Sequence, residues 1–151
     1  MIKPEAEVLM SWLRIAQAAL AAATLSAPLA AESRVAGAWH PEVYTLEDGT
    51  VQEVTGLIFF TERDWTVLFF TLDGRGGLTR GAGEGGTYTL EGNRLVFTHL
   101  YHLSGGSTPL KMSVKSPGEA EVEPCRIELE GETLTIYFPS GNKMSFRKSS
   151  S

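Results

Sequence analysis

The sequence predicts an all-β protein, an antiparallel up-and-down barrel of about eight to nine strands preceded by an N-terminal helical segment. After residue 35, apolar and polar residues alternate with a period of two, which is typical of strands with one dry and one wet face. Turn residues separate these stretches at close, even spacing, as in a meander of hairpins. Residues 5–27 differ in kind, because they are rich in alanine and leucine.

Residues 1–31 are predicted to be an export signal or a retained N-terminal helix. Residues 5–25 contain no glycine or proline, and alanine and leucine are strong helix formers. The run 15–25 has about the length of a signal-peptide apolar core, and small residues follow it. We expect the mature domain to span residues 32–151 and to be periplasmic or secreted. If the helix is retained, as an amphipathic one, we expect a cytoplasmic protein.

The domain of residues 32–151 contains nine candidate strands, at 37–46, 51–60, 64–72, 86–90, 94–103, 109–115, 122–130, 133–139 and 142–148. Closing such a meander into a barrel removes its exposed edges. Strands 51–60 and 64–72 are apolar on both faces, so their outer face needs a cover. The N-terminal helix, a second subunit in a homodimer and a membrane surface are the three covers that we consider.

Composition excludes several classes of function. The net charge of −5 argues against a nucleic-acid partner, because such proteins need a basic face. The single cysteine, Cys125, allows no intramolecular disulfide and no cysteine-based zinc site, and its phase predicts a small buried hydrophobe. His99 and His102 lie three apart on a strand and therefore should face opposite sides. We predict no metal site and no cofactor.

The strand 37–46 opens with Gly37-Ala38-Trp39, which resembles the Gly-Xaa-Trp signature of lipocalins and other calycin barrels. The resemblance, to lipocalin-like domains of the bacterial kind, covers roughly residues 35–148. It implies that Trp39 closes the floor of the barrel. It also implies that Arg147, near the end of the last strand, packs its guanidinium across the indole ring. Both residues are therefore predicted to be structural.

Strand 94–103 carries the candidate binding residues. Its more apolar face holds Phe97, His99 and Tyr101, so we expect these side chains to point inward beside Trp65 and Phe69 of strand 64–72. Such a pocket suits a small, flat, mainly apolar molecule held by one or two hydrogen bonds. Burial should disfavour the charged imidazolium, so His99 is predicted to be neutral near pH 7. His40 and His102 are expected to be exposed.

Residues 74–86 are dense in glycine but lack the ending of a phosphate-binding loop. They are predicted to form a mobile lid or a long hairpin at the mouth of the barrel, with Arg75, Arg80 and Glu84 at the rim.

These observations leave three functions open. The first is a barrel that binds a small apolar or aromatic molecule in its interior. The second is a secreted interaction or inhibitor protein with a filled core. The third is an isomerase, cyclase or dehydratase that uses His99 and Tyr101. No catalytic motif is strong enough to name a reaction, so catalytic residues stay unassigned.

Overall fold

The structure is a computed structural model that describes residues 34–106 and 109–150, so the predicted signal or helix of residues 1–31 lies outside the described residues. The described part contains one short 3-10 helix, η1 (Pro117–Glu119), and ten strands. The strands are β1 (Gly37–Thr45), β2 (Val51–Gln52), β3 (Val54–Phe60), β4 (Asp64–Leu72), β5 (Leu78–Glu91), β6 (Arg94–Gly106), β7 (Lys111–Val114), β8 (Glu121–Glu130), β9 (Thr133–Tyr137) and β10 (Lys143–Lys148).

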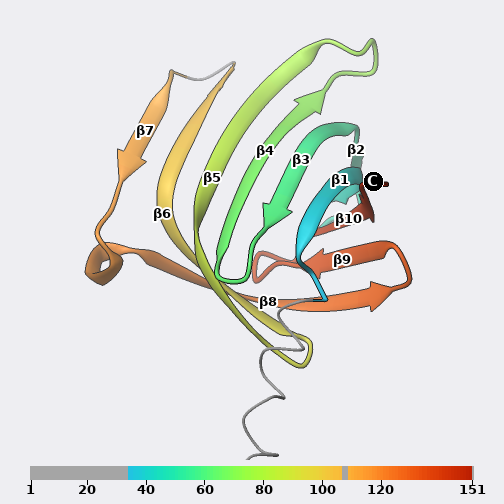
Figure 1. Cartoon of the computed structure of the whole chain (residues 1–151). Coiled ribbons are helices and arrows are strands. Elements are labelled where there is room, and N and C mark those ends of the chain that lie inside the picture. The colour runs from blue at the N-terminus through green and yellow to red at the C-terminus, as the bar shows by residue number, and fades with distance from the viewer. Residues whose placement is uncertain (1–33, 107–108, 151) are drawn as a thin grey trace, which may run out of the picture.

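Antiparallel pairing closes these strands into a barrel (Figure 1). The circuit runs β1-β3-β4-β5-β6-β8-β9-β10 and returns through the pairing of β10 with β1. Two short strands lie off it: β2 pairs with β1, and β7 pairs with the upper part of β6. The predicted all-β antiparallel barrel is confirmed. Within the described residues, no helix is long and apolar enough to cross a membrane.

Of the two forms predicted for the glycine-rich segment 74–86, the structure shows the long hairpin and not the lid, because all of the segment after residue 77 belongs to β5, which pairs with β4. The turn before β5 is short, and Gly76 in it takes a φ of +77°. At Gly81, Gly85 and Gly86 of β5, a neighbouring strand lies close enough to crowd an added Cβ, whereas Gly83 would make only ordinary contacts. A Cβ at Gly86 would lie 1.9 Å from the Thr98 backbone oxygen, and one at Gly85 would lie 3.0 Å from the Trp65 oxygen. Glycine density here therefore reflects close backbone approach rather than a loop.

The lower part of the barrel is filled by apolar side chains. Trp39 is fully buried in it, as predicted, and its Nε1–H donates to the Val35 oxygen at 2.8 Å. Its neighbours in this core are large residues from the other strands: Phe60, Tyr88, Leu90, Leu95, Phe97, Ile127, Leu134, Ile136 and Phe146. Cys125 is buried in the same core, as its phase predicts.

The predicted stacking of Arg147 on Trp39 is wrong. Strand pairing sets Trp39 opposite Lys148, and the Lys148 ammonium lies 5.3 Å from the centre of the indole. Arg147 belongs to the opposite face, because it alternates with the inward-facing Phe146. There its Nε donates to Glu42 Oε1 at 2.6 Å. The cation at the floor is therefore a lysine, one position later.

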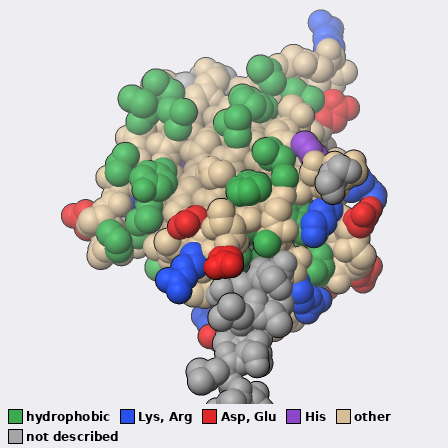
Figure 2. All heavy atoms as spheres, in the orientation of Figure 1, with side chains coloured by type: hydrophobic (Ala, Val, Ile, Leu, Met, Phe, Trp, Pro, Cys, Tyr) green, Lys and Arg blue, Asp and Glu red, His purple; other side chains and the backbone are tan. Residues whose placement is uncertain are grey.

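The outer face of β3 to β7 carries exposed hydrophobic side chains, which Figure 2 shows in several groups on that side. One row follows the strand register from Leu57 through Leu68 and Gly83 to Leu103 and Met112. The four large members of this row are all exposed. The apolar outer face expected on β3 and β4 thus continues to β7, and its cover stays a prediction.

Candidate functional site

A β-bulge in β6 decides which side chains reach the barrel interior. Gly86 of β5 pairs with His99, whereas Gly85 pairs with Tyr101, so Leu100 is an extra residue on β6. Below the bulge, His99 keeps the inward phase of the core. Above it the phase is inverted, because one inserted residue turns every following side chain to the other face.

The inversion overturns two expectations. Tyr101 points outward and is 56% exposed, so it does not line the interior of the barrel with His99. His102 instead turns inward and is half-buried, and Ser104 beyond it is buried. His99 and His102 therefore face the same side of the sheet, contrary to the opposite placement expected from simple alternation. His40 is exposed, as expected.

The upper part of the barrel holds a cavity of about 190 Å³. Four of the predicted binding residues line it: Trp65, Phe69, Phe97 and His99. The rest of its wall comes from strands on both sides of the barrel: Tyr44, Ile58, Val67, Glu84, Glu123, Ile136, Phe138, Ser140, Asn142, Met144 and Phe146. The cavity is therefore mainly aromatic and aliphatic, with a charged group of side chains at one end.

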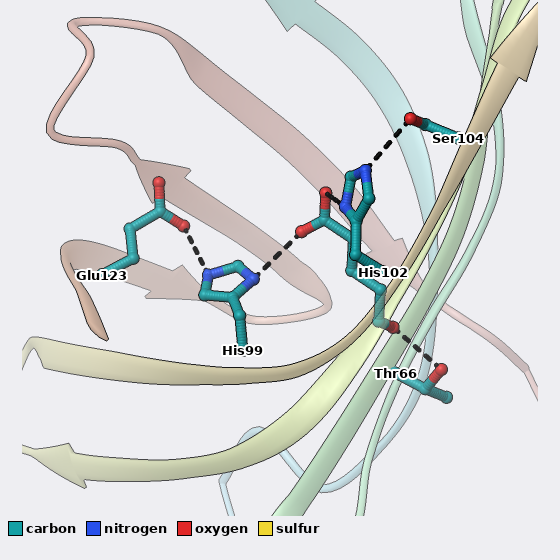
Figure 3. Close-up of polar contacts among 6 residues, drawn as sticks. Thr66, His99, His102, Ser104 and Glu123 are labelled. Atoms are coloured by element: carbon teal, nitrogen blue, oxygen red, sulfur yellow. Dashed lines mark hydrogen bonds and ion pairs between the residues drawn. The ribbon is translucent and has the colours of Figure 1, made fainter. Parts of the chain in front are cut away.

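That charged end is built around His99. Its Nδ1 lies 3.1 Å from Glu84 Oε2, and its Nε2 lies 3.3 Å from Glu123 Oε2. The ring stands between the two carboxylates, as Figure 3 shows for the Glu123 side. The three residues come from β5, β6 and β8, so the contacts join three neighbouring strands. The ring also packs edge-on against Trp65, with centroids 5.0 Å apart.

These contacts make His99 a cation. Hydrogen bonds to Glu123 and then to Glu84 outweigh the effect of burial and raise the pKa of His99 from 6.5 to about 9. The neutral imidazole predicted from burial alone is therefore wrong near pH 7. The same hydrogen bond from His99 is the main reason that the pKa of Glu84 is lowered. At neutral pH the group is an imidazolium held by two carboxylates.

Glu84 also reaches His102. Its Oε1 lies 3.2 Å from His102 Nδ1, and His102 Nε2 lies 3.0 Å from the Ser104 hydroxyl (Figure 3). Because a carboxylate only accepts hydrogen bonds, Nδ1–H of His102 donates to Glu84, and Nε2 of His102 shares a second hydrogen bond with the Ser104 hydroxyl. The Thr66 hydroxyl also holds the backbone of β5 at this position, because it donates to the Glu84 backbone oxygen at 3.1 Å. Both oxygens of the Glu84 carboxylate are thus fixed.

A second depression, of about 380 Å³, borders the same side chains. It lies where β6 passes from its pairing with β8 to its pairing with β7, and Lys115 and Glu121 line it together with Glu84, His99 and Glu123. The group around His99 therefore borders both this depression and the interior cavity. In the described part of the chain, no three or more His, Cys, Asp and Glu side chains are arranged to hold a metal ion.

Sequence reasoning placed Glu84 at a loop rim and did not single out Glu123 or Ser104 for the site. The signal that could have found them is the pair Gly85-Gly86 opposite strand 94–103. Adjacent glycines inside a strand often mark a bulge, and a bulge inverts the phase of the residues beyond it.

Comparison with protein-family models finds no match, and comparison with curated proteins finds none either. Among solved structures, the chain is similar to a lipocalin-like protein from Bacteroides uniformis ATCC 8492. The match has a TM-score of 0.48 and 20% sequence identity, and it covers 77% of this chain and 99% of that one.

Proposed function

We propose that the barrel binds a small apolar or aromatic molecule in its upper cavity. The observation that carries the proposal is the cavity itself: about 190 Å³ of space above an otherwise filled core. An apolar cavity of roughly 150 Å³ accommodates benzene, so this one suits a single ring with a short substituent.

The wall of the cavity has the composition of a ligand site. Binding sites for small molecules are mostly apolar and aromatic, with a few placed polar groups that fix orientation. Here Trp65, Phe69 and Phe97 supply the aromatic surface, and the carboxylates of Glu84 and Glu123 supply the polar end. This favours binding over an interaction protein with a wholly filled core.

The described geometry does not favour an enzyme. Tyr101, the expected partner of His99, points outward, and both ring nitrogens of His99 are held by carboxylates. The contacts Glu84–His102–Ser104 have the order of a serine–histidine–acid triad. However, Ser104 is only 7% exposed, and the lining of the interior cavity does not include it. We therefore assign His102 and Ser104 to the positioning of Glu84, and labelling of Ser104 by a fluorophosphonate would contradict this.

A cavity-filling variant tests the proposal. Val67 lies on the cavity wall, so Val67→Phe should fill the space and weaken binding of small aromatic molecules about tenfold or more. Binding is measured by calorimetry and by quenching of tryptophan fluorescence, using indole, phenol and benzyl alcohol as probes. Leu68→Phe on the same strand is the matched control, because Leu68 faces outward and is 50% exposed.

Binding by the wild type that survives in Leu68→Phe and is lost in Val67→Phe supports the cavity. Equal binding by all three proteins would place the probes elsewhere and overturn the proposal. Circular dichroism in the near ultraviolet confirms that each variant keeps the packing of the barrel.

A further inference from the structure

At the polar end of the cavity, a ligand can use a carboxylate oxygen as an acceptor, but His99 has no N–H left to donate. Both N–H groups of His99 are directed at carboxylates, and both oxygens of Glu84 are engaged by histidines. Glu123 uses only Oε2, at 3.3 Å from His99. Within the described residues, Oε1 of Glu123 has no hydrogen-bond partner, and Glu123 is on the cavity wall. A ligand that reaches this end therefore meets a carboxylate oxygen and needs a donor of its own.

The charges around this end favour a cationic donor. Three carboxylates face the two adjoining hollows, namely Glu84, Glu121 and Glu123. Against them stand the protonated His99 and Lys115, while His102 is bonded through Nδ1 to Glu84. Leaving His102 aside, the three carboxylates exceed the two cations, His99 and Lys115, by one. A hydrogen bond from a charged donor to a carboxylate is also stronger than one from a neutral donor.

The aromatic wall suits the same kind of ligand. Trp65 and Phe97 have ring centroids 4.4 Å apart, and both line the cavity together with Phe69 and Tyr44. Faces of such rings attract cations as well as apolar bodies.

We propose that the ligand is a small aromatic amine, bound as its ammonium ion, with the nitrogen on Oε1 of Glu123 and the ring against Trp65 and Phe97. This inference rests on the proposed function, because it assumes that the cavity is the binding site. It adds the chemical class of the ligand and assigns Glu123 as the residue that selects it.

Matched probes of equal size test the inference on the wild-type protein. Benzylamine, 2-phenylethylamine and tryptamine are compared by calorimetry at neutral pH with benzyl alcohol, 2-phenylethanol and tryptophol, and with phenylacetate. We expect each amine to bind about tenfold tighter than its alcohol and phenylacetate to bind most weakly, as a charge-assisted hydrogen bond would produce.

A charge-removing variant then locates the effect. Glu123→Gln keeps the shape of the side chain, so it should weaken the amines about tenfold and leave the alcohols within about twofold. Glu130→Gln is the matched control: it removes one negative charge from an exposed site on the same strand, β8. It should change neither class of probe.

The two proposals fail in different ways. Alcohols that bind as tightly as amines, with no selective loss in Glu123→Gln, would overturn the amine inference while binding in the cavity stands. Failure of every probe to bind the wild type, or binding that Val67→Phe leaves unchanged, would overturn the proposed function and this inference together. Because the amine-to-alcohol comparison uses the wild type, it holds even if Glu123→Gln folds poorly.

Discussion

The group around His99 should make the stability of the barrel depend on pH, and His99→Gln should remove that dependence. The pKa of His99 rises from 6.5 to about 9 on folding. At about 1.4 kcal/mol for each pH unit, the full effect would be about 3 kcal/mol. Solvent reduces it, because the side chains of His99 and Glu123 are 19% and 31% exposed. We therefore expect the cluster to contribute about 1–2 kcal/mol through this proton.

The sign follows from the direction of the pKa change. The folded protein holds the His99 proton more tightly than the unfolded chain does, so the stabilisation is fully present below about pH 6.5. It is lost as the pH rises towards about 9, where the folded protein also releases the proton. The pKa of Glu84 is lowered instead, so its contribution is lost only under acidic conditions.

Urea denaturation at about pH 6 and about pH 9.5 measures the effect as the difference between wild type and His99→Gln. That difference should shrink by about 1–2 kcal/mol from the lower to the higher pH. His40→Gln is the control, since His40 is exposed and its ring contacts the Gly56 oxygen rather than a carboxylate. A His99 ring that titrates near 6.5 by NMR, or a difference that is constant with pH, would refute the reasoning.

Four further outcomes are expected. Trp39→Ala should cost about 3–5 kcal/mol in the free energy of unfolding, measured in urea, because Trp39 is fully buried. Arg147→Ala should leave the free energy of unfolding nearly unchanged in the same assay, since it breaks only an exposed ion pair. Gly86→Ala should lower the melting temperature clearly, whereas Gly118→Ala, with open space around it, should not. Burial, with a smaller effect of a nearby carboxylate, raises the pKa of Cys125 to about 12, so iodoacetamide should label Cys125 only after unfolding.

The fold was predictable because the side chains of most strands in this chain alternate between an apolar inner face and a polar outer face. Strands such as β8, β9 and β10 alternate without interruption, and turn residues mark their ends. The face on which each of their side chains lies therefore follows from alternation along the strand. The same alternation places Arg147 on the outside, because it is the neighbour of the inward-facing Phe146. The resemblance to a family pattern favoured the wrong residue there, and strand phase decides for Lys148.

The candidate site was predictable only in part, because it lies at the β-bulge in β6, where the alternation of side chains is interrupted. Trp65, Phe69, Phe97 and His99 precede the bulge or lie on a regular strand, and they line the cavity as expected. Beyond the bulge the phase is inverted, and Tyr101 leaves the interior. The charge of His99 could not be read from its own strand either. It depends on carboxylates from β5 and β8, which only the tertiary structure brings to it.

The pairing of β1 with β10 also has a consequence for how the barrel folds. Trp39 pairs with Lys148, and Asn142 donates to the Tyr44 hydroxyl at 2.8 Å, so the seam joins the two ends of the domain. Contacts between residues so distant in sequence form slowly, because a long loop must close first. During synthesis, one edge of β1 has no partner until β10 has left the ribosome. Until then, the unpaired edge of β1 can pair with strands of other chains. Burial of the Trp39 indole should therefore coincide with closure of the barrel and with the loss of this tendency to aggregate.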